Sequence, residues 1–180
     1  MEKWKHLMVD IESFGTTADS VVLSIGAVPF NLDGNIGKDF EVYPKVQNQF
    51  SNRSTHWTSI QWWFKQEQSV RFQQADANRC DDLNSCLNQF SSFCLENLSE
   101  NFKIWGNGFD IALLNHSYEQ YGMKTPWSYK NILDVRTLVW LSKISVKKYE
   151  IDKTKAHDAL NDCKYQISFL IDGYKILKDY

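Results

Sequence analysis

The feature that most constrains the fold of this chain is a short apolar run, Leu7–Val9, that ends in two acidic residues, Asp10 and Glu12. A run of this length is typical of a buried strand and too short for a helix. Side chains alternate along a strand, so Asp10 and Glu12 project from one face and Ile11 from the other. Two carboxylates on one face are ligands that Mg²⁺ or Mn²⁺ prefers. A polar strand end that leads into a turn has the same pattern.

Further short runs predict a sheet around this first strand. Val21–Phe30 is rich in β-branched residues, Asn31–Asn35 has the Asp-Gly composition of a turn, and Phe40–Tyr43 alternates. Together with the first strand they predict an antiparallel meander. Phe102–Trp105 and Asn131–Leu133 are expected to form the fourth and fifth strands.

Apolar residues that recur at steps of three and four predict helices in the rest of the chain. The expected spans are 83–98, 110–121, 135–144 and 160–174. Strands first, followed by strands mixed with helices, predict an α/β fold in which helices flank a mixed five-stranded sheet. No repeat or Pro/Gly-rich linker interrupts the 180 residues, so a single domain over 1–180 is expected.

The composition limits the classes of function. The formal net charge is −2, which argues against a broad basic surface for duplex nucleic acid but not against a small site that grips one strand end. No apolar run approaches the roughly 20 residues that span a bilayer. The N-terminal apolar segment is too short for a signal-peptide core. We therefore expect a cytoplasmic protein without a membrane partner.

A third acidic residue, Asp110, follows a predicted strand and the segment Trp105–Phe109. Asp is common at the start of a helix, where it caps backbone N–H groups. A residue at a strand-to-helix junction also faces the C-terminal edge of the sheet, where ligands gather in α/β folds. Both roles are open for Asp110 on the sequence alone.

His157 and Asp162 are five residues apart at the start of the last predicted helix. At about 100° per residue, five helical steps separate two side chains by about 140°. The two side chains therefore converge only if His157 lies in the turn before the regular helix, with Asp158 as the residue that caps it. The alternative is a surface Asp and a His at the helix start that share no site.

The order Asp10-x-Glu12, then Asp110, then His157-x-x-x-x-Asp162 resembles the DEDDh branch of the DnaQ-like exonuclease superfamily. More narrowly, the chain resembles the exodeoxyribonuclease VIII-like and phage DexA-like exonucleases and the related mycobacterial-type exoribonucleases. The segments that carry this resemblance extend over nearly the whole chain: Val9–Ser13, Leu23–Val28, Trp62–Trp63 with Gln66, Trp105–Gly108, Asp134–Thr137 and His157–Leu160. Ser13 departs from the pattern, because Thr is commoner at that position.

The resemblance implies a ribonuclease H-like fold and a DEDDh exonuclease domain that removes nucleoside monophosphates stepwise from a 3′ end. It implies two divalent cations, Mg²⁺ or Mn²⁺, held by Asp10, Glu12, Asp110 and Asp162. His157 would complete the catalytic set as the general base for the attacking water.

The resemblance also implies a set of substrate contacts: Ile11, Ser13, Phe14, Trp62, Gln66 and Asn107. Core packing is the alternative for Ile11 and Trp62, and a turn-fixing role is the alternative for Asn107. The expected partner is the 3′ end of a single strand, with DNA favoured over RNA by the phage-type resemblance. The same site acting on RNA stays open, as does the oligomeric state, a homodimer included. A non-catalytic ribonuclease H-like binding module is a third alternative, but it would need none of the five catalytic-type residues.

Overall fold

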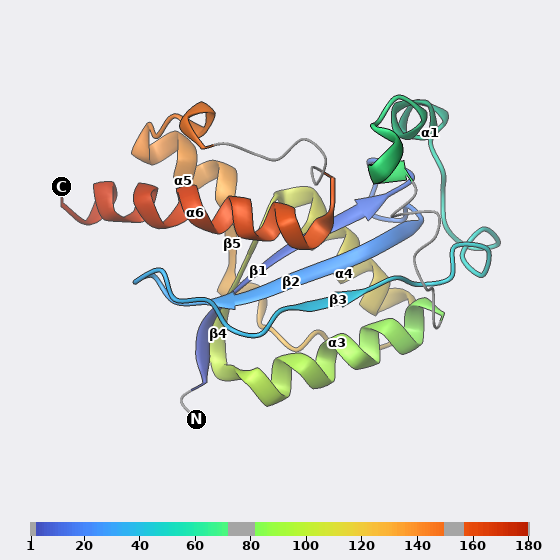
Figure 1. Cartoon of the computed structure of the whole chain (residues 1–180). Helices are drawn as coiled ribbons and strands as arrows, with labels where there is room; N and C mark the ends of the chain where they lie inside the picture. Colours follow the sequence, from blue (N-terminus) through green and yellow to red (C-terminus); the bar gives the residue numbers. More distant parts are fainter. Residues whose placement is uncertain (1–2, 72–81, 150–156, 180) are drawn as a thin grey trace.

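A mixed sheet of five strands forms the centre of the structure, a computed structural model that describes residues 3–71, 82–149 and 157–179 (Figure 1). The strands are β1 (Trp4–Ser13), β2 (Val22–Phe30), β3 (Phe40–Val42), β4 (Leu98–Gly106) and β5 (Ile132–Asp134), in the order β3-β2-β1-β4-β5. β1 pairs antiparallel with β2 and parallel with β4. β2 pairs antiparallel with β3, which confirms the predicted meander. β1 extends beyond its apolar run because Asp10 and Glu12 continue the pairing with β2.

Helices cover both faces of this sheet. They are α1 (Trp57–Phe64), α3 (Leu83–Asn97), α4 (Gly108–Gln120), α5 (Val135–Ser142) and α6 (Ala159–Lys178), with short 3₁₀ turns η1 (Tyr129–Asn131) and η2 (Val146–Lys148). α3 and α4 pack on one face, and α5 and α6 pack on the other (Figure 1). The predicted α/β class and its helices are confirmed to within a few residues. In the part of the chain that is described, no helix is both long and apolar enough to cross a membrane.

Two apolar cores, one on each side of the sheet, divide the side chains of β1 between them. Leu7, Val9 and Ile11 belong to the core that contains α3 and α4. Met8 belongs to the core that contains α5 and α6. Because the alternation continues along the strand, Asp10 and Glu12 lie on the same face as Met8. The two acids therefore face the side of the sheet that α6 covers. This confirms the prediction that they lie on the opposite face of β1 from Ile11.

Gly26 in β2 lets the first turn of α6 lie directly on the sheet. It pairs with Asp10 across the two central strands. A Cβ atom at Gly26 would lie 2.6 Å from the carbonyl carbon of Ala159 and 2.7 Å from the backbone nitrogen of Leu160. Any side chain at this position would push the helix backbone away. The glycine thus allows the N-terminal end of α6 to lie beside the acids of β1.

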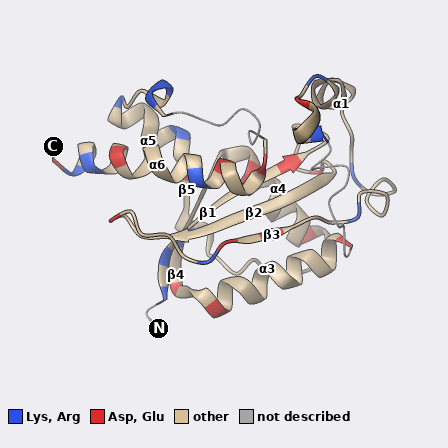
Figure 2. Ribbon diagram, in the orientation of Figure 1, with Lys and Arg blue, Asp and Glu red and all other residues tan. Residues whose placement is uncertain are grey.

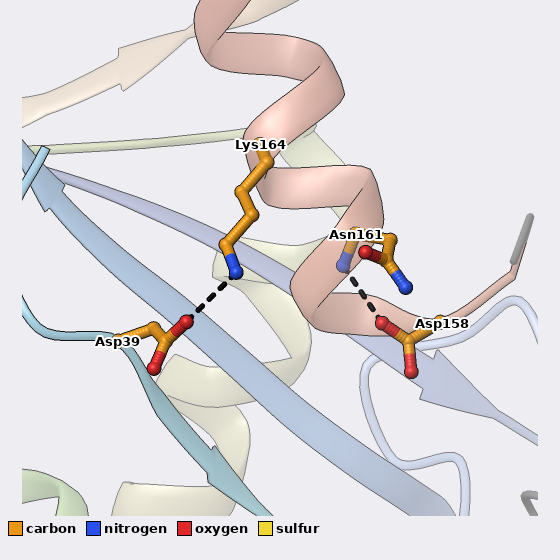
Figure 3. Close-up of polar contacts among 4 residues, drawn as sticks. All are labelled: Asp39, Asp158, Asn161 and Lys164. Carbon is orange, nitrogen blue, oxygen red and sulfur yellow. Dashed lines mark hydrogen bonds and ion pairs between the residues drawn. The ribbon is translucent and has the colours of Figure 1, made fainter. Parts of the chain in front are cut away.

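Two polar contacts fix the start of α6 (Figure 3). Asp158 is the N-cap residue, as predicted, and its Oδ1 accepts a hydrogen bond from the backbone N–H of Asn161 at 2.7 Å. Lys164 forms an ion pair with Asp39, which precedes β3, at an Nζ–Oδ2 distance of 2.8 Å. Both side chains of this pair are 41% exposed, so the ion pair orients the helix and adds little stability.

We expect Gly26→Ala to destabilise the fold by about 1–3 kcal/mol, the usual range for an overpacked contact, because the added methyl group would displace the backbone of α6. Urea unfolding at fixed pH measures the difference. Gly108→Ala is the matched control, since a Cβ there would meet only Asp134 Oδ2, at 3.8 Å. Equal stability of Gly26→Ala and the unsubstituted chain would contradict the close packing of α6 on β2.

Candidate active site

Four acidic side chains from three elements meet at the C-terminal end of β1. Asp10 and Glu12 come from β1, Asp110 from the first turn of α4, and Asp162 from the first turn of α6. Figure 2 shows acidic residues where β1 ends next to the start of α6. Asp10, Glu12 and Asp110 are each less than a tenth exposed, and the charges of the other three acids act on Asp10. The structure thus brings together the four carboxylates that the sequence grouped.

Burial raises the pKa of each carboxyl in this cluster, and repulsion from the neighbouring acids adds to it for Asp10 and Glu12. For Asp10, burial is the largest cause, followed by the charges of Asp110, Glu12 and Asp162, and its pKa lies well above the usual value. Burial, then the charges of Asp162 and Asp110, raises the pKa of Glu12 to about 8. Burial also raises the pKa of Asp110 to about 7 and that of Asp162 to about 6. Without a counter-charge, the cluster therefore retains protons near neutral pH.

Asp110 combines the two roles that its position left open. It is the third residue of α4, and its Oδ2 accepts a hydrogen bond from the backbone N–H of Asn107 at 3.0 Å. This bond favours the charged carboxylate and so opposes the effect of burial on its pKa. The same carboxyl group acts electrostatically on Asp10. Helix capping and membership of the cluster are therefore compatible.

His157 lies in the turn before α6, where the angular argument required it to be. Its φ of 61° is a left-handed conformation outside the helix. His157, Glu12 and Asp162 each offer one nitrogen or oxygen atom within 4.8 Å of the others. Burial lowers the pKa of His157, so its imidazole is neutral near pH 7 and can accept a proton. The ring of Trp62 packs against it edge to face, with the ring centroids 4.6 Å apart.

The chemistry of the cluster fits a divalent cation. Asp162 Oδ1 is buried and has no hydrogen-bond partner among the described residues. Clustered carboxylate oxygens are the ligands that Mg²⁺ and Mn²⁺ prefer. A cation would also offset the repulsion that raises the pKa values of Asp10 and Glu12. The residues present can therefore hold the kind of ion that the sequence pattern implied.

A cavity of about 390 Å³ lies beside Glu12. Its lining combines apolar side chains with hydroxyl groups: Ile11, Trp62, Trp63 and Phe109, and Ser13, Thr16, Thr58 and Ser59. The volume falls in the range of about 300–1,000 Å³ that is usual for small-ligand sites. Three of the six predicted substrate contacts, Ile11, Ser13 and Trp62, line this cavity.

The other three predicted contacts are not among its lining residues. Phe14 packs against the small core that contains Trp63. Gln66 donates a hydrogen bond from Nε2 to the carbonyl oxygen of Trp62 at 2.9 Å, so it contacts the backbone of the helix end. Asn107 is the N-cap residue of α4. Phe14 and Gln66 therefore support the elements around the cavity, and Asn107 supports the position of Asp110.

The two adjacent tryptophans of α1 have different environments. Trp63 is 7% exposed, packs in the small core, and donates its indole N–H to the carbonyl oxygen of Ser13 at 2.9 Å. Trp62 is 40% exposed and contacts His157. The core role that was the alternative for Trp62 belongs instead to its neighbour Trp63, whereas Trp62 reaches the site.

Gln166 is a residue of the site that the sequence analysis missed. Its Nε2 donates a hydrogen bond to Asp10 Oδ1 at 2.7 Å, and its side chain is 7% exposed. It follows Asp162 by four residues, which puts both on one face of α6. A polar residue at that spacing, between the apolar positions Cys163 and Ile167, was the signal that could have identified it.

Known proteins are similar to this chain in sequence pattern and in fold. Residues 5–171 match the family model described as the 3′-5′ exoribonuclease Rv2179c-like domain. A comparison with curated protein sequences gave no significant match. The family match extends over nearly all of the chain and includes every residue of the acidic cluster together with His157.

Solved structures of bacterial exonuclease I share the fold. The zinc-bound E. coli exonuclease I in complex with single-stranded DNA has a TM-score of 0.67 and 16% identity, over 99% of this chain and 41% of that one. The moderately thermophilic exonuclease I from Methylocaldum szegediense has a TM-score of 0.65 and 13% identity, over 97% of this chain and 40% of that one. The chain therefore spans about two fifths of the length of these proteins. The likeness shows a ribonuclease H-like exonuclease fold.

The raised pKa of Glu12, about 8 against a usual 4.5, gives the metal-free protein a specific pH dependence. The folded state binds more protons than the unfolded chain between these values, so stability in chelator should fall as the pH rises through this window. Glu12→Gln removes the charge, so it should stabilise the protein at pH 8 by on the order of 1 kcal/mol. For a chain of this size, each kcal/mol raises the Tm by roughly 2–4 °C. At pH 5 the gain should be small.

Thermal unfolding in EDTA at the two pH values measures this effect. Glu119→Gln is the control, because Glu119 is an exposed residue of α4. A Tm of Glu12→Gln equal to or below that of the unsubstituted chain at pH 8 would mean that the acids do not repel one another as their burial implies.

Proposed function

The chain belongs to the Rv2179c-like family of 3′-5′ exoribonuclease domains, and from this premise we propose that it hydrolyses single-stranded nucleic acid stepwise from the 3′ end. The observation that carries the proposal is the group of four carboxylates, three of them buried, beside a neutral histidine and a cavity of about 390 Å³. Burying acids is costly without compensation. A module that only binds nucleic acid would gain nothing from this cost.

Asp10, Glu12, Asp110 and Asp162 are proposed to hold two divalent cations, Mg²⁺ or Mn²⁺. Such a pair stabilises the attacking and leaving oxygens of an in-line displacement at phosphorus. The charges of the other three acids all act on Asp10, which puts its carboxylate at the centre of the proposed cation site. The unpartnered Oδ1 of Asp162 supports its role as a ligand.

His157 is proposed to accept the proton of the attacking water. Two observations support this role: burial lowers its pKa, and one of its ring nitrogens lies near the carboxylates of Glu12 and Asp162. The contact with Trp62 restricts the orientation of the imidazole. The same ring nitrogen lies close enough to Glu12 and Asp162 to contact a cation held there, so the effect of His157→Ala on Mn²⁺ affinity distinguishes a general base from a metal ligand.

The cavity beside Glu12 is proposed to take the 3′-terminal nucleotide. Ile11 and Trp62 offer apolar and aromatic surface to a base, which can stack on any aromatic ring. Ser13 and Thr58 bring hydroxyl groups that can hydrogen-bond a sugar. A nucleotide in this cavity would have its phosphate next to the carboxylates.

RNA is the better supported substrate, with DNA as the second candidate. The family match names exoribonuclease activity and covers residues 5–171. The E. coli exonuclease I that is bound to single-stranded DNA shares the fold at only 16% identity. The phage-type resemblance that favoured DNA therefore carries less weight than the family match. A 2′-hydroxyl would be the group that distinguishes the two substrates.

We further propose that residues 1–180 form one domain of the DEDDh type, related to the exodeoxyribonuclease VIII-like and phage DexA-like subgroup. The extent of the family match supports a single domain. The order of the four acids and His157 along the chain supports the DEDDh assignment. The Trp62–Trp63 pair and the His157–Leu160 segment support the narrower subgroup.

Digestion of single-stranded RNA and DNA, each labelled at the 3′ or the 5′ end, tests the proposed activity. In Mn²⁺ we expect the 3′ label to be released first as a nucleoside monophosphate and the 5′-labelled strand to shorten stepwise. No turnover is expected in excess EDTA, or with Asp10→Ala in Mn²⁺, because the carboxylates act through the cations.

Full turnover in EDTA, or efficient cleavage of a circular single strand, would rule out the proposed reaction. RNA should be degraded faster than DNA of the same sequence. Faster degradation of DNA would leave the proposed 3′-5′ exonuclease activity intact but would make DNA the preferred substrate.

We expect His157→Ala to lower the rate by roughly 10²–10⁴, the usual contribution of a general base, because no other neutral imidazole lies beside the described carboxylates. The affinity for Mn²⁺ should change little, and it can be measured by calorimetric titration. His116→Ala is the control, since His116 lies on α4 outside the proposed site. If His157→Ala weakened Mn²⁺ binding as much as Asp162→Ala does, His157 would be a metal ligand and the proposed mechanism would be wrong.

A further inference from the structure

Gln166 is a buried polar residue of α6 with apolar neighbours on the same helix. Its neighbours Cys163, Ile167 and Leu170 pack in the core beneath α6. A methionine or leucine would fill the same space without burying an amide. Packing alone therefore does not explain the residue, and its hydrogen bond to Asp10 at 2.7 Å points to a task at the acidic cluster.

The direction of the amide follows from its partner. A carboxylate that binds a cation is ionised and can only accept hydrogen bonds, so Nε2 of Gln166 faces Asp10. This bond occupies Asp10 Oδ1 and leaves Oδ2 for other contacts. One side chain on α6 thereby fixes the orientation of a carboxylate on β1.

The other end of the amide has no partner. Oε1 of Gln166 is buried and accepts no hydrogen bond from the described residues. Oδ1 of Asp162, one helical turn earlier on the same face, is in the same condition. Buried acceptors are rarely left unpaired in proteins. Two such atoms lie on one helix face beside the carboxylates, where a hydrated cation would supply the missing hydrogen bonds.

We propose that Gln166 is a positioning residue for the cation site: its amide N–H orients Asp10, and its amide oxygen accepts a hydrogen bond from a water molecule bound to the cation. Partners behind the ligands commonly hold them in the geometry that the ion requires. The inference rests on the proposed function, because it assumes that the acidic cluster binds divalent cations.

The test compares Mn²⁺ binding by the unsubstituted chain, Gln166→Met and Lys164→Met, measured by calorimetric titration without substrate. Gln166→Met keeps the volume and removes both hydrogen-bonding groups. We expect its affinity for Mn²⁺ to fall by about 10–100-fold, the usual cost of losing such a partner. Its activity should recover as the Mn²⁺ concentration is raised. Lys164→Met removes the ion pair of α6 with Asp39 and should leave Mn²⁺ affinity unchanged.

Several results would overturn the inference. One is a Mn²⁺ affinity of Gln166→Met that lies within about twofold of that of the unsubstituted chain, because the expected loss is much larger. Another is an equal loss in Lys164→Met, which would mean that any disturbance of α6 weakens the site. If Gln166→Met does not fold, Gln166→Asn replaces it: this variant keeps the amide but is one methylene too short to reach Asp10, so it should also bind Mn²⁺ more weakly. An unchanged Mn²⁺ affinity in Gln166→Asn would contradict the proposed role of Gln166.

The same experiment separates this inference from the proposed function. If the unsubstituted chain neither binds Mn²⁺ nor shortens RNA or DNA, the proposed function fails. If the unsubstituted chain does both and Gln166→Met matches it, only the role of Gln166 fails.

Discussion

The repulsion among the carboxylates buried at the end of β1 is the constraint on which the rest of the site depends. Asp10, Glu12, Asp110 and Asp162 come from three separate elements, and the charges of Asp110 and Asp162 add to burial in raising the pKa of Asp10 and of Glu12. Acids in such an arrangement either keep their protons or share a cation. The neighbouring groups suit the second state: the backbone N–H of Asn107 and the amide of Gln166 both donate to the cluster and favour ionised oxygens.

The fold meets this constraint by docking one helix closely onto the sheet. α6 carries Asp162 and Gln166, and it reaches the acids of β1 because Gly26 leaves room for its first turn. Because Asp158 is the N-cap, His157 lies before the first residue of α6, and its imidazole lies near Glu12. If the N-cap moved by one residue, the side chains of His157 and Asp162 would shift relative to each other.

Features set by local periodicity were predictable from the sequence, whereas features set by docking were not. Alternation in β1 placed Asp10 and Glu12 opposite Ile11, and helical geometry required His157 to precede α6. The same rules gave the five strands and their mixed arrangement.

Periodicity identifies the face on which a side chain lies but not its partner on another element. The different environments of Trp62 and Trp63 depend on how α1 packs against the end of β1 and against His157, which are far apart in the sequence. The bond from Gln166 to Asp10 joins residues 156 positions apart and depends on the closeness of α6 to the sheet. Such contacts follow from tertiary packing, which a local pattern cannot specify.

The most direct test of the central claim is a crystal structure of the chain grown with Mn²⁺ and examined by anomalous scattering. The account predicts that two Mn²⁺ ions bind at this cluster, as the proposed reaction requires, with Asp10, Glu12, Asp110 and Asp162 as the residues that hold them. Crystals in saturating Mn²⁺ that show no anomalous peak at the carboxylates, or ions bound only elsewhere, would contradict it.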